Sequence, residues 1–438
     1  MKSLFSNLNF LSLFTGRMVT NIGDSIYYVA SMWLVYQLSG STFYTGLAGF
    51  LILLPKTLQF LTGPLVDRWN VKKTLITTQL LQAVLILIIP AAYMLDLLSV
   101  QLILIVMPLL AIIAEFAYPV QTKMLPLVLT KDQLVKGNSL MAFAYQGIDL
   151  VFNALAGVMV NLVGAIALYW MDSVTFIAAA ICFAMLKLYQ PGLLQKEPAA
   201  VAASYSFKIY ISDLQKGFSI VFHSLLRFFL IGLVVANFAI GCSMAVLPAF
   251  ADYIGGAESY GLLLAAMSAG SLIGALAGAS CSKYRMGKLI IVCFTIGAVC
   301  WTISAMVTLP AVSIVLFGIA WIFIGMVNVM FAGIFQSVIP NHLLGRVNSV
   351  MTSISVIAMP IGSLLGGYFA TRMQPSLLLA AAGGGIFFIA VVWLLHPRLR
   401  QLPAVTQIDR SILSLNIPEE KEDVELSKPI NPQCKTIG

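Results

Sequence analysis

Charged side chains inside long apolar runs are the residues of this sequence most able to do chemistry. Asp24, Glu115 and Asp149 each lie well inside such a run. A charge at the centre of a bilayer costs at least ~2.5–3.5 kcal/mol, so a residue of this kind indicates a function. A carboxyl group in apolar surroundings holds its proton more tightly than in water, which lets it exchange protons near neutral pH. We therefore predict that these three carboxyl groups couple proton movement to another process.

Two cations, Arg17 and Lys56, are the expected counter-charges. The depths of Asp24 and Lys56 differ by only ~6 Å at ~1.5 Å per residue, which a lysine side chain can span. This pair is open to two interpretations, a proton-coupling site or a static ion pair that holds two helices together. Asp172 lies nearer the outer surface, and a structural role is expected for it. The last five apolar runs carry no charge away from their ends, so proton chemistry is predicted for the first half.

The elements that position these residues are predicted to be membrane-spanning helices. Of the 438 residues, 60% are hydrophobic and 10% are charged, which excludes a soluble protein. A spanning helix needs ~20 mostly apolar residues. The sequence predicts an all-α polytopic membrane protein with twelve such runs, at residues 10–37, 42–66, 73–96, 99–124, 138–162, 165–187, 224–252, 259–281, 288–308, 311–338, 348–371 and 376–396.

The net charge of +8 reflects topology. If the N-terminus is inside, the loops assigned to the cytoplasm hold nearly all loop Lys and Arg residues, and the opposite loops hold essentially Arg372. Basic loops stay inside, so a multi-pass protein of the cell membrane with both termini cytoplasmic is predicted, without a cleavable signal peptide. No nucleic acid partner is expected. The six cysteines form no CxxC pair, so neither a disulfide framework nor a metal site is expected.

The chain repeats itself. The stretch GPLVDRWNVKK (63–73) returns as GASCSKYRMGK (278–288), an offset of 215 that also places Gly46 on Gly261. An offset of 210 places Asn138-Ser139 on Asn348-Ser349, and Gly157 on Gly367. The repeat predicts two six-helix halves that face the same way. The predicted domains are an N-terminal bundle (1–187), a cytoplasmic linker with an amphipathic helix (188–223), a C-terminal bundle (224–396) and a disordered cytoplasmic tail (397–438).

Two parallel repeats, twelve spans and a long central loop resemble the layout of the major facilitator superfamily. GPLVDRWNVKK resembles the signature loop of that superfamily between its second and third helices. GDSIYYVASMWLVYQLSGS, LPLVLTKDQLVKGNSL, YWMDSVTFIAAA and SDLQKGFSIV resemble the branch that contains bacterial macrolide efflux pumps and enterobactin exporters. The resemblance implies a secondary active transporter that exports amphipathic small molecules by alternating access, driven by protons.

The resemblance also implies a cytoplasmic gate in the repeated loop. Asp67 would face the N-terminus of helix eleven, where a carboxylate gains ~0.3–1 kcal/mol. The alternative is that the basic residues only anchor the loop on the cytoplasmic side. The residues assigned to the gate are Gly63, Asp67, Arg68, Lys72, Lys73, Asn348 and Ser349.

Aromatic, amide and methionine side chains inside the spans suit a large, mostly apolar ligand. Ordinary packing is the alternative for each of them. The residues assigned to a substrate cavity are Asn21, Tyr28, Trp33, Gln146, Asn237, Trp321, Asn328 and Met330.

The sequence contains no phosphate-binding loop and no HExxH motif, and its three histidines lie near span ends, so neither an enzyme nor a cofactor is expected. The expected partners are a small-molecule substrate, protons and the lipid bilayer, and the expected state is a monomer. Two other functions remain open. One is a dedicated exporter of a single metabolite, such as a siderophore, peptide antibiotic or lysolipid. The other is a non-transporting receptor or assembly protein on the same fold.

Overall fold

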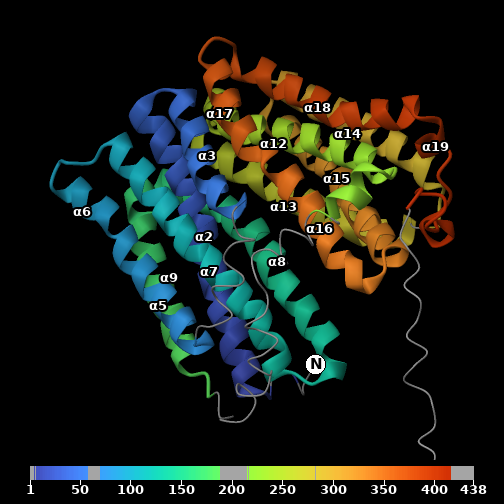
Figure 1. Ribbon diagram of the computed structural model, residues 1–438. Coiled ribbons are helices and arrows are strands. Elements are labelled where there is room, and N and C mark those ends of the chain that lie inside the picture. Colours follow the sequence, from blue (N-terminus) through green and yellow to red (C-terminus); the bar gives the residue numbers. More distant parts are fainter. Residues whose placement is uncertain are drawn as a thin grey trace, which may run out of the picture.

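The protein consists of long helices, and no strand occurs in the described residues (Figure 1). The computed structural model describes residues 4, 6–57, 70–187, 215, 217–281 and 283–415. The prediction of an all-α membrane protein is confirmed.

The first half of the chain forms the first group of helices. The third predicted span is divided at Leu87 into two helices, α5 and α6. In chain order the elements are α2 (Leu8–Ser39), α3 (Thr42–Thr57), α5 (Val71–Ile86), α6 (Ile88–Met94), α7 (Val100–Val128), α8 (Lys131–Val163) and α9 (Ala165–Ala184).

The second half forms the other group, and its fifth span is divided at Ile357. The elements are α12 (Leu226–Ile254), α13 (Gly256–Cys281), α14 (Met286–Met306), α15 (Pro310–Val338), α16 (Asn341–Val356), α17 (Ala358–Ala370) and α18 (Pro375–Leu395).

In the described part of the chain, nine helices or helix pairs are long and apolar enough to cross a membrane. The other three predicted spans coincide with α2, with α3 and with α8, whose apolar part is the shorter stretch Gly147–Val163. The count of twelve therefore stays a prediction.

Local sequence signals explain where several helices begin and end. The Asn7 side chain accepts hydrogen bonds from the first free N–H groups of α2, and the Asn70 side chain accepts from Lys73 N at 3.1 Å at the start of α5. Proline occupies the first position of α15 and α18, where no N–H partner is needed. Helix α2 ends at Gly40, whose φ of 60° is the left-handed conformation that favours glycine.

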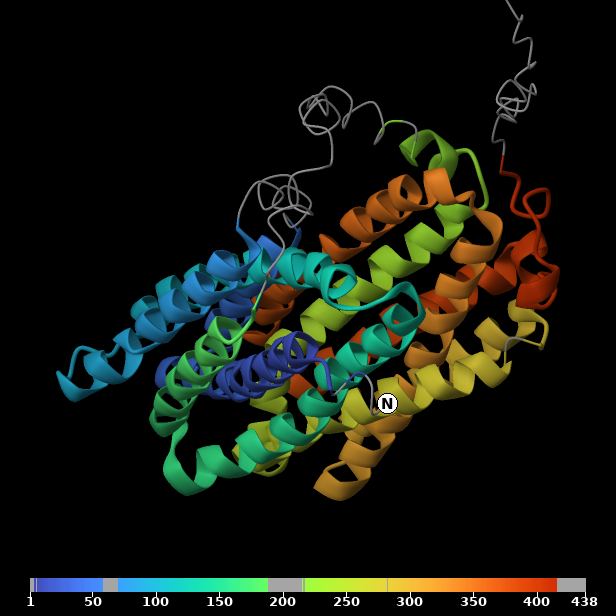
Figure 2. The ribbon, with the colours of Figure 1, turned by 90° about the horizontal axis from the view of Figure 1, so that it is seen from below.

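Within each half the helices pack mainly on one another. In the first half, α2 packs on α8 and α9, while α5 packs on α7 and α9. In the second half, α13 packs on α15, α14 on α18, and α12 on α17 and α18. Seen from below, first-half helices lie on one side and second-half helices on the other (Figure 2). The predicted domain boundaries are compatible with this packing and stay a prediction.

The halves meet through two glycine contacts near one end of the helices. A Cβ atom on Gly46 of α3 would lie 2.7 Å from Gly367 Cα of α17. A Cβ atom on Gly157 of α8 would lie 2.8 Å from Gly261 Cα of α13. Only glycine permits backbones to approach this closely. We call this the closed end of the molecule.

The two glycine contacts are equivalent by the internal repeat. The sequence offsets place Gly46 on Gly261 and Gly157 on Gly367. Each contact therefore joins one glycine of the equivalent pair Gly46/Gly261 to one glycine of the equivalent pair Gly157/Gly367. Exchanging the two halves turns one contact into the other.

Side-chain hydrogen bonds to backbone oxygens reinforce the closed end. Thr42 Oγ1 donates to Gly367 O at 3.1 Å, and Ser363 Oγ donates to Gly46 O at 3.1 Å. Thr45 Oγ1 donates to Ala245 O at 2.7 Å. A hydrogen bond of this type contributes ~0.5–1.5 kcal/mol net, so the closed end is held by several weak contacts.

The opposite ends of the two halves diverge, and we call this side the open end. In Figure 1, α3 and α17 lie together at the top, whereas α16 and the lower parts of the first-half helices separate. Helix α16 packs mainly on α12, α15 and α17 of its own half. Lys73 and Asn348, both near this end, are exposed.

The first part of the predicted disordered tail is folded, which corrects that expectation for residues 397–415. This C-terminal segment contains α19 (Pro397–Arg400) and a short 3-10 helix, η1 (Val405–Gln407). Leu399, Leu402 and Leu413 are 0–1% exposed. The segment is too short and irregular to show a helical period, so its apolar residues were not recognised as a packing surface. Residues 416–438 lie outside the described part.

The C-terminal segment caps helix ends of the second half. Pro403 O accepts from Met286 N at the start of α14 at 3.0 Å, and Leu413 O accepts from Leu225 N just before α12 at 3.0 Å. Arg410 Nε donates to Val338 O at the end of α15 at 3.3 Å. The predicted amphipathic linker helix lies mostly outside the described residues. The part of it that is described, residues 217–222, is helical.

We predict that Gly46→Ala loosens the closed end. The new Cβ atom would overlap the Gly367 backbone, and overpacking of this kind costs ~1–3 kcal/mol. Labelling of a cysteine introduced at the buried Thr42 should be faster in the Gly46→Ala background. Gly384→Ala is the control, because nothing lies within 4 Å of its Cβ position. Equal labelling in both backgrounds would contradict the assignment.

We also predict that the C-terminal segment stabilises the second half. Replacing a buried leucine by alanine costs ~2–5 kcal/mol, so the Leu402→Ala/Leu413→Ala double variant should unfold at a markedly lower temperature in detergent. The matched control is Gln401→Ala/Gln407→Ala, which changes two exposed residues of the same segment. Indistinguishable unfolding temperatures would exclude this role.

Candidate functional site

Charged groups from four helices of the first half lie close enough to act on one another. The charge of Lys56 on α3 acts on both Glu115 of α7 and Asp149 of α8. The charge of Arg17 on α2 acts on both Asp24 and Asp149. The structure thus brings the five residues predicted for proton coupling and counter-charge into one cluster.

The cluster lies on the open side of the glycine contacts. Lys56 follows Gly46 by ten residues along α3, and Asp149 precedes Gly157 by eight along α8. At ~1.5 Å per residue, both groups are ~12–15 Å from the contacts in the direction of the open end. Both side chains are exposed. The cluster therefore lies where the two halves diverge, which makes its charged groups accessible from the open end.

Asp149 has a hydrogen-bond partner on the neighbouring helix. Ser25 Oγ of α2 lies 2.7 Å from Asp149 Oδ1 and 2.8 Å from Asn21 O in its own helix. A serine hydroxyl has one proton to donate, so it can donate to only one of these oxygens at a time. The sequence reasoning missed Ser25, although its position directly after Asp24 places it near the cluster.

Of the two expected counter-charges, Arg17 is the one that acts on Asp24. In the described part of the chain, the charges acting on Asp24 are those of Arg17 and Asp149, and Lys56 acts instead on Glu115 and Asp149. Arg17 and Asp24 are seven residues apart on α2, which is about two turns and places them on one face. Asp24 and Lys56 have similar depths in the membrane, but equal depth does not imply that the two side chains lie on facing helix surfaces.

Asp172 lies at a tight contact between α2 and α9. Its side chain is 0% exposed, and Thr175 Oγ1 donates to Asp172 Oδ1 at 2.9 Å. A Cβ atom on Gly23 would collide with the same carboxyl group. Asp172 also acts electrostatically with Asp24, so it borders the cluster from α9. These contacts agree with the structural role expected for it.

A buried polar chain connects α2 with α5 and was not predicted. Thr20 Oγ1 donates to Gln79 Oε1 at 2.8 Å, and Gln79 Nε2 donates to Gln82 Oε1 at 3.2 Å. The signal was present in the sequence, because two glutamines three residues apart in an apolar run share one helix face.

Three of the residues assigned to a substrate cavity are core residues in this structure. Trp33 is 4% exposed and stacks on Tyr260 of α13, with ring centroids 6.3 Å apart. Trp321 and Met330 are 8% and 2% exposed within the second half. Their burial fits the packing alternative, and their assignment to a substrate cavity stays a prediction. Tyr28 is hydrogen-bonded to Tyr260 and helps join the two halves.

The remaining cavity residues are amides. Asn21 is buried, and its Nδ2 donates to Ala144 O at 3.3 Å, which ties α2 to α8. Asn237 is half-buried on α12, and Asn328 is exposed on α15. The side chain of Gln146 lies outside the described part. Asn237 and Asn328 thus stay candidates for ligand contacts from the second half.

Most of the predicted gate lies outside the described residues, namely Gly63, Asp67, Arg68 and the side chain of Ser349. Lys72 Nζ donates to Leu186 O at 2.6 Å, just beyond the end of α9. Lys72 thus caps a helix end within the first half, a role that the sequence reasoning did not foresee.

The comparisons with known proteins agree with this architecture. A family model described as "Transmembrane secretion effector" matches residues 3–429. This chain belongs to that family of major facilitator superfamily transporters. The resemblance noted from the sequence is therefore confirmed.

Characterised relatives of this transporter are efflux proteins by name. The multidrug efflux pump Tap of Mycolicibacterium fortuitum is 24% identical over 404 residues, covering 90% of this chain and 96% of that protein. Macrolide efflux protein A of Streptococcus pyogenes is 26% identical over 414 residues, covering 90% and 97%.

Solved structures share the fold of the transporter at low sequence identity. A bacterial homologue of the human lysosomal transporter Spinster, in an inward-facing and occupied conformation, superposes with a TM-score of 0.66 at 12% identity, covering 88% of this chain and 95% of that chain. The nucleoside transporter NupG gives 0.63 at 11% identity, covering 89% and 98%.

We predict that Ser25→Ala weakens the link between α2 and α8. A hydrogen bond to a charged group contributes ~1.5–3 kcal/mol, and the exposure of Asp149 reduces this to about 1 kcal/mol. The unfolding temperature in detergent at pH 7 should fall for Ser25→Ala and recover for Ser25→Thr. Thr15→Ala is the control, because the Thr15 hydroxyl bonds to carbonyls of α2 itself, such as Leu11 O at 2.7 Å. A similar fall for Thr15→Ala would refute the assignment.

Proposed function

We propose that this transporter exports amphipathic small molecules from the cytoplasm by alternating access, driven by protons. The observation that carries the proposal is the cluster of Asp24, Glu115 and Asp149 with Arg17 and Lys56. These groups come from four helices, lie within range of one another's charges and are on the open side of the contact between the two halves.

The distribution of basic residues supports an open end that faces the cytoplasm. Basic residues gather on the cytoplasmic side of membrane proteins. The closed end has Arg372, accompanied by the acidic residues Asp96, Asp252 and Glu258. Near the open end lie Lys72, Lys73, Lys187, Arg227, Lys283, Arg285, Lys288, Arg398, Arg400 and Arg410.

Asp149 and Ser25 supply a proton-linked element within this proposal. While Asp149 is ionised, the Ser25 hydroxyl donates to it across the α2–α8 contact. When Asp149 takes up a proton, it becomes a donor itself, and the Ser25 hydroxyl turns to Asn21 O, which is already 2.8 Å away. Protonation also removes a negative charge from beside Arg17 and Lys56, which changes the balance of charge between the helices.

Alternating access requires that the closed end can open. Each of its hydrogen bonds contributes only ~0.5–1.5 kcal/mol net, and a population shift needs two arrangements of the halves that differ by a few kcal/mol. A substrate and a proton that bind the two arrangements unequally then shift the population from one to the other. Asp67 and the start of α16, by family resemblance, would close the open end in the other arrangement.

The related pumps Tap and macrolide efflux protein A support export of drug-like molecules as the direction and substrate class. The half-buried Asn237 and the exposed Asn328 are the second-half amides we assign to ligand contact. No specific feature of the described residues favours the receptor role or a single dedicated metabolite, and the transport assay below separates them.

We expect Asp24→Asn, Glu115→Gln and Asp149→Asn each to reduce proton-driven uptake of ethidium or a macrolide into everted vesicles at least about tenfold, which corresponds to ~1.4 kcal/mol. The control is Asp96→Asn, an exposed carboxylate at the closed end whose φ of 56° asparagine also tolerates. Wild-type uptake that ignores the pH gradient, with all three variants unchanged, would refute proton coupling. Absence of any uptake by wild-type vesicles would favour a dedicated exporter or a receptor.

A further inference from the structure

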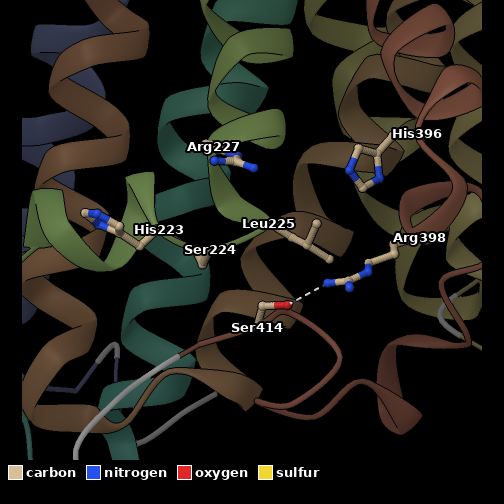
Figure 3. Close-up of a pocket in the computed structure, with 7 residues that line it drawn as sticks. All are labelled: His223, Ser224, Leu225, Arg227, His396, Arg398 and Ser414. Atoms are coloured by element: carbon tan, nitrogen blue, oxygen red, sulfur yellow. Dashed lines mark hydrogen bonds between the residues drawn. The ribbon is translucent and has the colours of Figure 1, made fainter.

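A basic cavity of about 320 Å³ lies at the open end of the second half, and it shares no residue with the charge cluster (Figure 3). Water occupies ~30 Å³ in the liquid, so the cavity is large enough for a small polar group with its hydration. Four segments form it: the residues before α12, the first turn of α12, the residues after α18, and the C-terminal segment. The lining residues are His223, Ser224, Leu225, Arg227, His396, Arg398 and Ser414.

The cavity collects positive charge without a counter-charge from its walls. Two arginines and two histidines line it, and none of its described lining residues is acidic. In Figure 3 the side chains of Arg227 and His396 point toward one another, whereas the ring of His223 points away. Burial, and then the charges of Arg398 and Arg227, hold the pKa of His396 below its usual value. The imidazole therefore experiences a positive field.

The cationic side chains are held in place by their neighbours. The Arg227 guanidinium carbon lies 4.9 Å from the centre of the Phe228 ring, and the His396 ring lies 4.3 Å from the same ring, centre to centre. Arg398 Nη1 donates to Ser414 Oγ at 3.2 Å. The Nδ1 atom of His396 is buried and has no hydrogen-bond partner among the described residues. The neighbouring side chains thus hold the two guanidinium groups at the cavity wall.

The cavity is at the level where a membrane span ends. Helix α12 begins at Leu226 and the span of α18 ends at Leu395. Leu394, Leu395 and Ile231 are 48%, 74% and 45% exposed, so an apolar surface that faces lipid adjoins the cavity. Lipid head groups occupy this level, and arginine side chains near a cytoplasmic membrane surface attract anionic lipids.

We propose that this cavity binds the phosphate group of an anionic ligand, and that its source is the head group of an anionic phospholipid. Guanidinium groups match the geometry of phosphate oxygens and bind them through charge-assisted hydrogen bonds. A bound phosphate neutralises the repulsion between Arg227 and Arg398. Because the C-terminal segment supplies Arg398 and Ser414, the ligand would also tie that segment to α12.

The test measures binding of dihexanoyl phosphatidylglycerol to the full chain in neutral detergent, followed by the rise in unfolding temperature and by native mass spectrometry. We expect Arg227→Gln/Arg398→Gln to weaken binding at least tenfold relative to wild type. The matched control is Lys283→Gln/Arg285→Gln, which removes the same charge from exposed residues at the same end. Without lipid, the pocket variant should unfold at the same temperature as wild type or higher, because two repelling charges are gone.

Two further ligands distinguish the source of the phosphate. Dihexanoyl phosphatidylcholine should bind more weakly than phosphatidylglycerol, because its head group carries a compensating positive charge. Inorganic phosphate that binds as well as phosphatidylglycerol would assign the cavity to a soluble phosphate instead of a lipid. Equal affinity of both double variants for phosphatidylglycerol would overturn the proposal. If the double variant is unstable, Arg398→Gln alone, at an exposed position, should still weaken binding relative to Lys283→Gln.

Discussion

The architecture depends on one constraint, which is that two membrane-embedded halves must touch closely at one end and stay apart at the other. In an apolar solvent no hydrophobic effect drives helices together, so their contact relies on packing and a few polar bonds. Gly46, Gly157, Gly261 and Gly367 meet this demand because the absence of a side chain lets backbone meet backbone. These contacts define the relation between the halves in this structure.

The charge cluster lies on the open side of that contact. Placing several charges within membrane-embedded helices is costly, and mutual neutralisation reduces the cost. Arg17 acts on Asp24 and Asp149, while Lys56 acts on Glu115 and Asp149. Asp149 takes part in both groups and also receives the Ser25 hydroxyl, so it is the most connected acid of the cluster. The second half contributes packing and capped helix ends, and its spans are nearly free of charge. The two halves share a fold by repetition but differ in what they add to it.

Much of the fold could be predicted from the sequence, because the length of apolar runs and an internal repeat can be recognised from the order of residues alone. Such signals predict the helices and the internal repeat that pairs the four glycines. They also predict that acids within the spans are restricted to the first half. Contacts between faces do not follow from such signals. Asp24 and Lys56 matched in depth, yet Arg17 is the cation that acts on Asp24. Trp33, Trp321 and Met330 are buried in this structure, and composition alone does not distinguish such packing from a ligand cavity, since in a nearly uniformly apolar helix no periodicity separates inward from lipid-facing positions. Residues 397–415 were missed because isolated leucines in an irregular segment have no period to detect.

That C-terminal segment has a consequence for biosynthesis. The ribosome makes it after every span of the second half, yet it supplies the caps for α12, α14 and α15. The first half can assemble while translation continues. The helix ends of the second half stay without these caps until residues 397–415 have been made. A premature stop codon shortly after the final span would therefore leave an inserted but unfinished protein, recognisable to membrane quality control.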